Sequence, residues 1–186
     1  MDSHPELHIR LYDPANDAAA LRACFIELQD WEHAIEPSIP EGEAVVDAYL
    51  VEMLADCGAS AGCVFLAESA GTVVGFVSVF AQVMPSKDEA QEPHAYISDM
   101  VVRSSHRGQG VGRRLMAEAE AFARKAGVKE LRVGVLAGNE GAHRLYRDCG
   151  FADYTVELRK ALSARAAVGS AGAAVTPAAR RSERPE

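Results

Sequence analysis

The stretch Ile97-Ser-Asp-Met-Val-Val102, followed after a short turn by Arg107-Gly-Gln-Gly-Val-Gly-Arg-Arg-Leu115, decides the fold expected for this chain. The first segment is apolar and rich in β-branched residues, which predicts a buried strand. Glycines then alternate at positions 108, 110 and 112 and open a predicted helix. Glycine allows a close backbone approach, and the first amides of a helix lack intrahelical partners. Together these features predict a phosphate-binding site.

Two widespread phosphate-binding patterns do not fit this loop. A P-loop requires a Lys-Ser or Lys-Thr pair after its glycines, whereas Arg114 is followed by no such pair. A dinucleotide fingerprint requires the spacing G-x-G-x-x-G, and Gly108-Gln-Gly-Val-Gly112 is one residue too short for it. The loop therefore follows neither of these two patterns.

A second motif lies downstream and completes a family resemblance. The predicted strand Leu131–Leu136 is followed by Asn139-Glu-Gly-Ala-His-Arg-Leu-Tyr-Arg-Asp-Cys-Gly-Phe151. This resembles the Asn-x-x-Ala-x-x-x-Tyr helix and following Gly-Phe of the GNAT superfamily of N-acetyltransferases. The glycine loop resembles the acetyl-CoA loop of the same superfamily, Gln/Arg-x-x-Gly-x-Gly/Ala, through Arg107, Gly110 and Gly112. The resemblance covers roughly residues 8–160.

The order of predicted elements agrees with what this resemblance implies. Apolar periodicity and turn residues predict strands at 7–12, 62–67, 72–80, 95–102, 131–136 and 153–158, and helices at 18–28, 43–55, 111–126 and from 139. The expected fold class is α/β (α+β), a GNAT-like mixed and mostly antiparallel central sheet flanked by helices. Residues 1–162 are expected to form one acetyltransferase domain. Residues 163–186 lack periodicity and are predicted to be a disordered C-terminal tail.

Composition restricts the partners and the location. The chain of 186 residues carries a net charge of −8, which argues against non-specific nucleic-acid binding and favours a cationic partner such as an amine. The alternative is that the acidity only keeps the protein soluble. No apolar run approaches the ~20 residues needed to span a membrane, and no signal peptide is visible, which predicts a cytoplasmic protein. The cysteines form no zinc pattern, so no metal is expected.

The resemblance also implies which residues hold acetyl-CoA, the expected cosubstrate. The amides of Gly108–Arg113 are expected to bind the pyrophosphate, and the strand before the loop is expected to pair with the pantetheine. The second motif adds contacts from its helix, and Asn139 is also expected to cap that helix. The full set of expected cofactor-binding residues is Met100, Val101, Val102, Arg107, Gly108, Gln109, Gly110, Val111, Gly112, Arg113, Asn139, Ala142 and Tyr146.

Two residues are the hypothesised catalysts. Tyr146 is placed by the resemblance as the general acid, because a tyrosine stays protonated at pH 7 and can donate to the CoA sulfur. The alternative is a packed helix tyrosine whose hydroxyl reaches solvent. Asp99 is the candidate general base, acting directly or through water, and it is unusual as a carboxylate on an apolar strand. The alternative for Asp99 is a structural hydrogen bond.

The predicted activity is therefore direct transfer of an acetyl group from acetyl-CoA to a primary amine, of a small molecule or a peptide, in a ternary complex. The competing hypothesis is a non-catalytic acyl-CoA-binding sensor or regulatory module. Substrate selection is expected from two acidic segments, Gln29–Gly42 and Met84–Pro93, which could equally be solvated loops. The oligomeric state is left open between monomer and homodimer, and no nucleic acid or membrane partner is expected.

Overall fold

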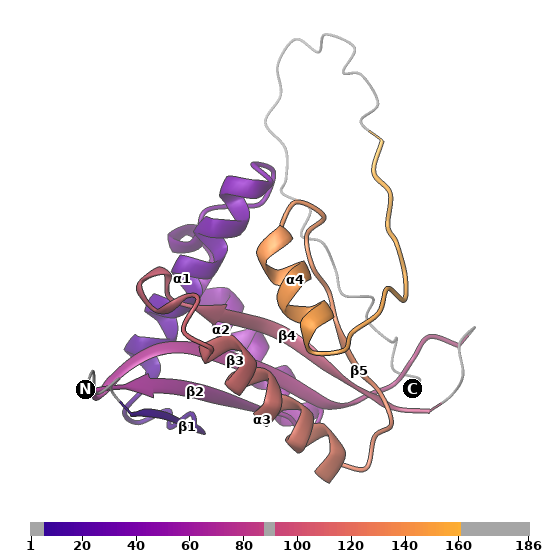
Figure 1. Cartoon of the computed structure of the whole chain (residues 1–186), viewed down its shortest axis with the longest axis horizontal. Helices are drawn as coiled ribbons and strands as arrows, with labels where there is room; N and C mark the ends of the chain where they lie inside the picture. Colours follow the sequence, from indigo (N-terminus) through magenta and orange to yellow (C-terminus); the bar gives the residue numbers. More distant parts are fainter. Residues whose placement is uncertain (1–5, 88–91, 161–186) are drawn as a thin grey trace, which may run out of the picture.

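The computed structural model of the chain describes residues 6–87 and 92–160, and its centre is a five-stranded sheet in the order β1-β2-β3-β4-β5 (Figure 1). Strands β1 to β4 pair antiparallel with their neighbours, and β5 pairs parallel with β4. This confirms the predicted mixed, mostly antiparallel sheet. The strands are β1 (Leu7–Leu11), β2 (Cys63–Ser69), β3 (Thr72–Val83), β4 (His94–Val102) and β5 (Leu131–Val133).

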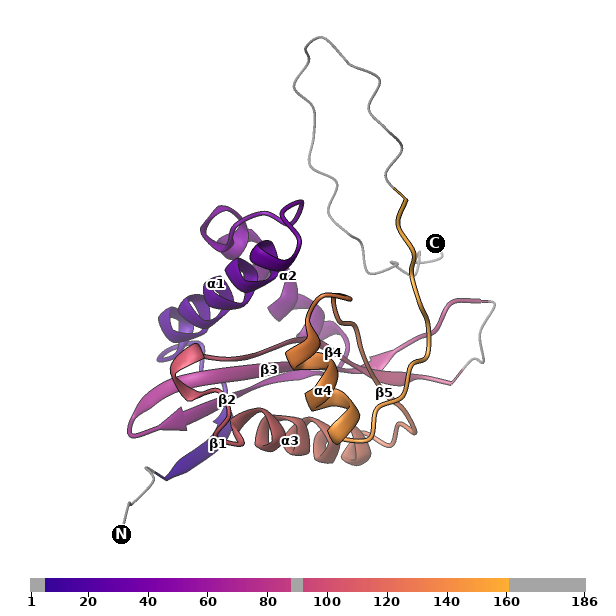
Figure 2. The same ribbon diagram turned by 45° about the horizontal axis from the view of Figure 1, so that its top comes forward.

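Helices cover both faces of the sheet, as predicted. Helix α3 (Val111–Lys125) lies on one face, while α1 (Ala18–Ile35) and α2 (Gly42–Ala59) lie on the other (Figure 2). Successive residues of a strand point to opposite faces, so Val77 packs towards α3 and Phe76 towards α1 and α2. A short 3-10 helix (Ser104–His106) follows β4, and α4 (Glu140–Asp148) lies beside the β4–β5 end of the sheet (Figure 1).

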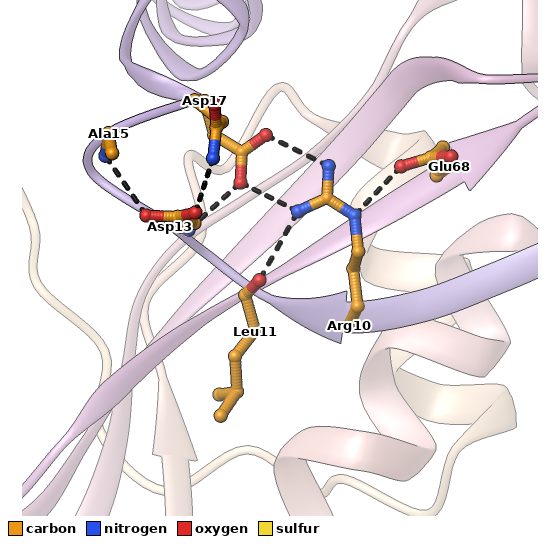
Figure 3. A network of polar contacts seen from close by, with 7 residues as sticks. Arg10, Leu11, Asp13, Ala15, Asp17 and Glu68 are labelled. Atoms are coloured by element: carbon orange, nitrogen blue, oxygen red, sulfur yellow. Dashed lines mark hydrogen bonds and ion pairs between the residues drawn. The ribbon is translucent and has the colours of Figure 1, made fainter.

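An arginine network ties the first strand to the start of α1. The Arg10 guanidinium donates to both Asp17 carboxylate oxygens, at 2.6 and 2.8 Å, and to Glu68 at 2.7 Å (Figure 3). The side chain of Asp17 makes no capping hydrogen bond to α1, because Arg10 and the amide of Asp13 occupy it. Its hydrogen bonds to Arg10 lower the pKa of Asp17 to about 2.

Helix α1 is longer than the sequence predicted. The expected end was Leu28, followed by an irregular segment from Gln29 to Gly42, but the helix continues to Ile35. The prolines responsible for that expectation, Pro37 and Pro40, restrict the backbone only just before and at their own positions. Two further turns of helix therefore follow Leu28 and bring Trp31 and Glu32 to the site described below.

The predicted last strand at 153–158 is wrong. Residues 151–160 form no strand, and the segment carries three largely exposed side chains, Tyr154 (62%), Val156 (76%) and Leu158 (89%). Alternating apolar residues form a strand only where a neighbouring strand accepts their backbone hydrogen bonds, and here none does so within the described residues. The predicted tail at 163–186 lies outside the described residues. No helix within 6–87 and 92–160 is both long and apolar enough to cross a bilayer.

Strands β4 and β5 part in the middle of β4. Their pairing runs only from Ala95–Leu131 to Ile97–Val133. On its other side β4 pairs with β3, where Ile97 faces Val79 and Asp99 faces Ser78, which leaves Ser98 as an extra residue in a bulge. From Ser98 onwards, therefore, β4 keeps one partner strand, and its other edge faces the gap opened by the departing β5.

Candidate active site

The glycine loop presents a run of free amides, as its sequence predicted. Gly108 (φ +74°) and Gly110 (φ +82°) adopt left-handed conformations, and α3 begins directly after Gly110. After Arg107, the first amide that donates to a backbone carbonyl is that of Arg114, which donates to the carbonyl of Gly110. Within the described residues, the six amides from Gly108 to Arg113 have no acceptor. Such a run of donors at a helix N-terminus suits a phosphate or pyrophosphate.

The loop opens into a cleft of about 530 Å³, called here the larger cleft. Gly112 allows α3 and α4 to approach there, since a Cβ at this position would lie 2.9 Å from Cδ2 of Leu145. All the residues predicted to bind the cofactor line the larger cleft except Gln109. The Gln109 side chain instead donates to the carbonyl of Ser105 at 3.1 Å, which stabilises the turn before the glycines.

A second, smaller cavity of about 60 Å³ occupies the gap between β4 and β5. One wall is the unpaired edge of β4 from Ser98 to Met100, and the other is the chain from Val133 to Leu136. Both spaces share the residues Leu28, Met100, Asn139, Ala142 and Tyr146. The larger cleft and the smaller cavity therefore meet beside the free edge of β4, where a bound chain can hydrogen bond to the strand.

Tyr146 lies where the two spaces meet. It is 8% exposed, and its ring packs against Phe151 with centroids 5.8 Å apart. Burial, assisted by the charge of Glu32, raises the pKa of Tyr146 to about 12, so the phenol remains protonated at neutral pH. Its hydroxyl has no hydrogen-bond partner within the described residues, although the side chain lines both spaces. The geometry therefore leaves this proton donor available to a ligand.

Asn139 caps α4, as predicted. Its Oδ1 accepts a hydrogen bond of 3.2 Å from the amide of Ala142, and both residues line the two spaces. A capping side chain satisfies one otherwise free amide of the helix, so this bond fixes where α4 starts and where its residues face. Tyr146, one turn after Ala142, takes its position from the same helix.

Asp99 is held by three side-chain donors. It is 8% exposed and accepts hydrogen bonds from Tyr49 (2.8 Å), Ser98 (2.7 Å) and Ser78 (3.0 Å). Burial raises the pKa of Asp99 against the opposing effect of these donors. No local pattern indicates Tyr49 or Ser78 as partners of Asp99, because they lie 50 and 21 residues away along the chain.

The end of α1 contributes two residues to the site. Trp31 lines the larger cleft, with the Arg107 guanidinium over its ring at 4.6 Å, while the Nε of Arg107 donates to the carbonyl of Val102. Glu32 lines the smaller cavity. Both come from the acidic segment Gln29–Gly42, which the sequence associated with substrate selection. The described part of the other acidic segment, Met84–Pro93, lines neither space.

A model of the acetyltransferase (GNAT) family matches residues 25–151, and the chain belongs to this family. It is 35% identical over 103 residues to aminoglycoside N(6')-acetyltransferase type 1 of Stenotrophomonas maltophilia, a match that covers 55% of this chain and 65% of that protein. It is also 35% identical over 94 residues to mycothiol acetyltransferase of Thermobispora bispora, covering 50% of this chain and 31% of that one. The match thus spans less than two thirds of each relative.

Solved structures share the fold. The structure of AAC(6')-Iy with a CoA-containing bisubstrate analogue superposes with a TM-score of 0.62 at 18% identity, over 84% of this chain and 99% of that one. A Bacillus halodurans protein superposes with a TM-score of 0.72 at 17% identity, over 83% of this chain and 99% of the other. These likenesses agree with the mixed sheet and the two helical layers described above.

Proposed function

We propose that this protein transfers an acetyl group from acetyl-CoA to a primary amine while both are bound. The observation that carries this function is the continuity between the free amides of Gly108–Arg113 and the cavity at the β4–β5 gap, where the Tyr146 hydroxyl is available. The amides that would bind a pyrophosphate therefore line the same cleft as a group that can donate a proton. Membership in a family of acetyltransferases supports this function.

Each part of the site would serve one need of the reaction. The loop amides bind the pyrophosphate, and the unpaired edge of β4 from Met100 to Val102 binds the pantetheine. An amide of that edge donates to the oxyanion that forms when the amine attacks the thioester carbonyl. Tyr146 then donates its proton to the departing sulfur. No enzyme nucleophile is needed, because holding two reactants together can supply about 7–11 kcal/mol.

Free-thiol release from acetyl-CoA across a panel of amines tests the proposal. The panel contains spermidine, kanamycin A, free lysine and a lysine-containing peptide, and a reaction without any amine gives the hydrolysis background. Amine-dependent release together with an acetylated product of the expected mass would support the function. CoA binding in calorimetry without release from any amine would contradict it, and would favour an acyl-CoA sensor instead.

A further inference from the structure

Two carboxylates line the smaller cavity, and their surroundings differ. Asp99 receives hydrogen bonds from Tyr49, Ser78 and Ser98, which occupy both of its oxygens. Glu32 also lines the cavity, yet no hydrogen bond or ion pair reaches its side chain from any residue in 6–87 or 92–160. Glu32 is therefore the carboxylate of this cavity that has free oxygens to offer a ligand.

We infer that Glu32 binds the ammonium group of the acceptor amine inside the smaller cavity and takes up a proton from it. This inference rests on the proposed acetyl transfer. It makes Glu32 both the base of that reaction and the group that binds the amine. Asp99 becomes the positioning residue behind the base, since its own oxygens are already engaged. The acceptor is accordingly a cationic primary amine.

The position of Glu32 follows from packing at the end of α1. Leu28 lies one helical turn earlier on the same face and lines the same cavity. A Cβ at Gly138 would lie 2.8 Å from Cγ2 of Ile35, so the loop that leads into α4 packs directly on the last turn of α1. The end of α1 and the start of α4 thus flank the cavity, and they bring Glu32 and Tyr146 to one space.

The charge of the cavity favours a cation. Its lining contains Glu32 and Asp99 but no lysine, arginine or histidine. Two tyrosines from packed elements feel the charge of Glu32, Tyr49 on α2 and Tyr146 on α4, while Tyr96 on β4 lies near Asp99. An ammonium group is the complement to such a lining, since it supplies the hydrogen-bond donors and the positive charge that Glu32 lacks.

The same surroundings suit Glu32 to proton transfer. Burial, with an added contribution from the charge of Asp99, raises the pKa of Glu32 above its ordinary value. A carboxylate with a raised pKa is a stronger base. Burial disfavours the charged form of a bound ammonium for the converse reason, and the two carboxylates of the cavity oppose that effect.

Two groups of the protein, Glu32 and Tyr146, accept and donate the protons that the reaction moves. The ammonium gives one proton to Glu32, and the free amine forms the C–N bond to the thioester carbonyl. Collapse of the tetrahedral intermediate breaks the C–S bond, and the departing thiolate takes the proton of Tyr146. The nitrogen then loses its second proton, which restores the phenol of Tyr146, while Glu32 releases its proton to solvent. One acetylated amine, one free thiol and one proton leave.

The test compares E32Q and E32D with the unchanged protein on the best amine of the panel. E32Q keeps the size of the side chain and removes the negative charge. We expect kcat/KM for the amine to fall at least ~100-fold at pH 7, with the KM for acetyl-CoA unchanged. The deficit should shrink to below ~10-fold when the pH exceeds the amine pKa of about 10, because the free amine no longer needs a base. E32D should recover part of the loss.

A matched control is E118Q, the same chemical change on the exposed side of α3, which should leave every constant unchanged. Thermal melting of all variants confirms that they are folded. If the unchanged protein acetylates an amine and E32Q does so equally well, or loses the same factor at every pH, the role of Glu32 is overturned and the transferase function stands. If the unchanged protein acetylates no amine in the panel, the proposed function itself is overturned.

Discussion

The phenolic hydroxyl of Tyr49 on α2 donates a hydrogen bond of 2.8 Å to Oδ1 of Asp99 on β4. This bond connects the helical layer to the bulged strand that lines the smaller cavity. Asp99 is buried and Tyr49 is half-buried, which limits the competition from water for this bond.

Removing this bond should destabilise the fold. Y49F leaves a buried carboxylate with one donor fewer, and we expect the free energy of unfolding to fall by about 1–3 kcal/mol. Urea denaturation followed by circular dichroism measures the change. Y12F is the control, because the hydroxyl of Tyr12 has no hydrogen-bond partner within the described ranges. Equal stability of Y49F and Y12F would contradict a structural role for the Tyr49–Asp99 bond.

Tyr146 should matter for turnover and hardly at all for binding. Y146F removes a hydroxyl that hydrogen bonds to no described residue, so the protein should fold normally and bind CoA with unchanged affinity. If the phenol protonates the departing sulfur, kcat should fall more than ~10-fold. Steady-state kinetics with acetyl-CoA and calorimetry with CoA separate the two effects. Unchanged kcat in Y146F would remove the proton-donor role, leaving Tyr146 as a packing residue of α4.

Gly110 should be required for the phosphate-binding conformation of the loop. It has φ +82°, and a Cβ there would meet no protein atom within 4 Å, so the cost of G110A is backbone strain of about 1–2 kcal/mol. We expect the affinity for CoA to fall at least ~5-fold, measured by calorimetry. G58A is the matched control near the end of α2. It should leave CoA affinity unchanged and raise stability by up to about 1 kcal/mol. Full affinity in G110A would show that the loop tolerates another conformation.

Acid should weaken the attachment of β1 to α1. The pKa of Asp17 is about 2 in the folded chain, below its ordinary value, chiefly because of the hydrogen bonds from Arg10. The stabilisation is complete above about pH 5 and is lost as the pH falls towards 2, where the carboxylate becomes protonated in the folded state too. The half-exposed Arg10 limits the size of the effect to about 1–2 kcal/mol.

The measurement for this pair is the unfolding free energy as a function of pH in the unchanged protein and in D17N. The variant should be less stable at pH 6, and the two curves should converge as the pH approaches 2. Parallel curves over this range would show that the ion pair contributes nothing that depends on pH.

The sequence predicted the core of the site because its signals are local. The β-branched run of β4, the glycines at 108–112 and the spacing from Asn139 to Tyr146 each specify a short piece of backbone whose conformation depends on neighbours in the sequence. The structure agrees for all three pieces. Those motifs also place the residues predicted to bind the cofactor around the larger cleft, with the exception of Gln109.

Long-range features could not be predicted in the same way. Two of the donors to Asp99, Tyr49 on α2 and Ser78 on β3, are distant in the sequence, and only the fold brings them to it. The end of α1 was misplaced because Pro37 and Pro40 indicated an irregular segment after Leu28, whereas the helix continues to Ile35, which packs against Gly138. The alternating residues after Asp153 have the period of a strand, but pairing requires a partner that no sequence pattern supplies.

The early separation of β5 from β4 should make the sheet less rigid beside the site. Only three residue pairs hold β5 to the sheet, so its amides should exchange with solvent faster than those of β3, which is paired on both sides. A ligand that hydrogen bonds to the free edge of β4 would occupy the place of a missing strand. It would lie between β4 and the chain that continues from β5. Occupancy of the gap should therefore make the sheet more rigid across the site, and slower amide exchange in Leu131–Val133 would report it.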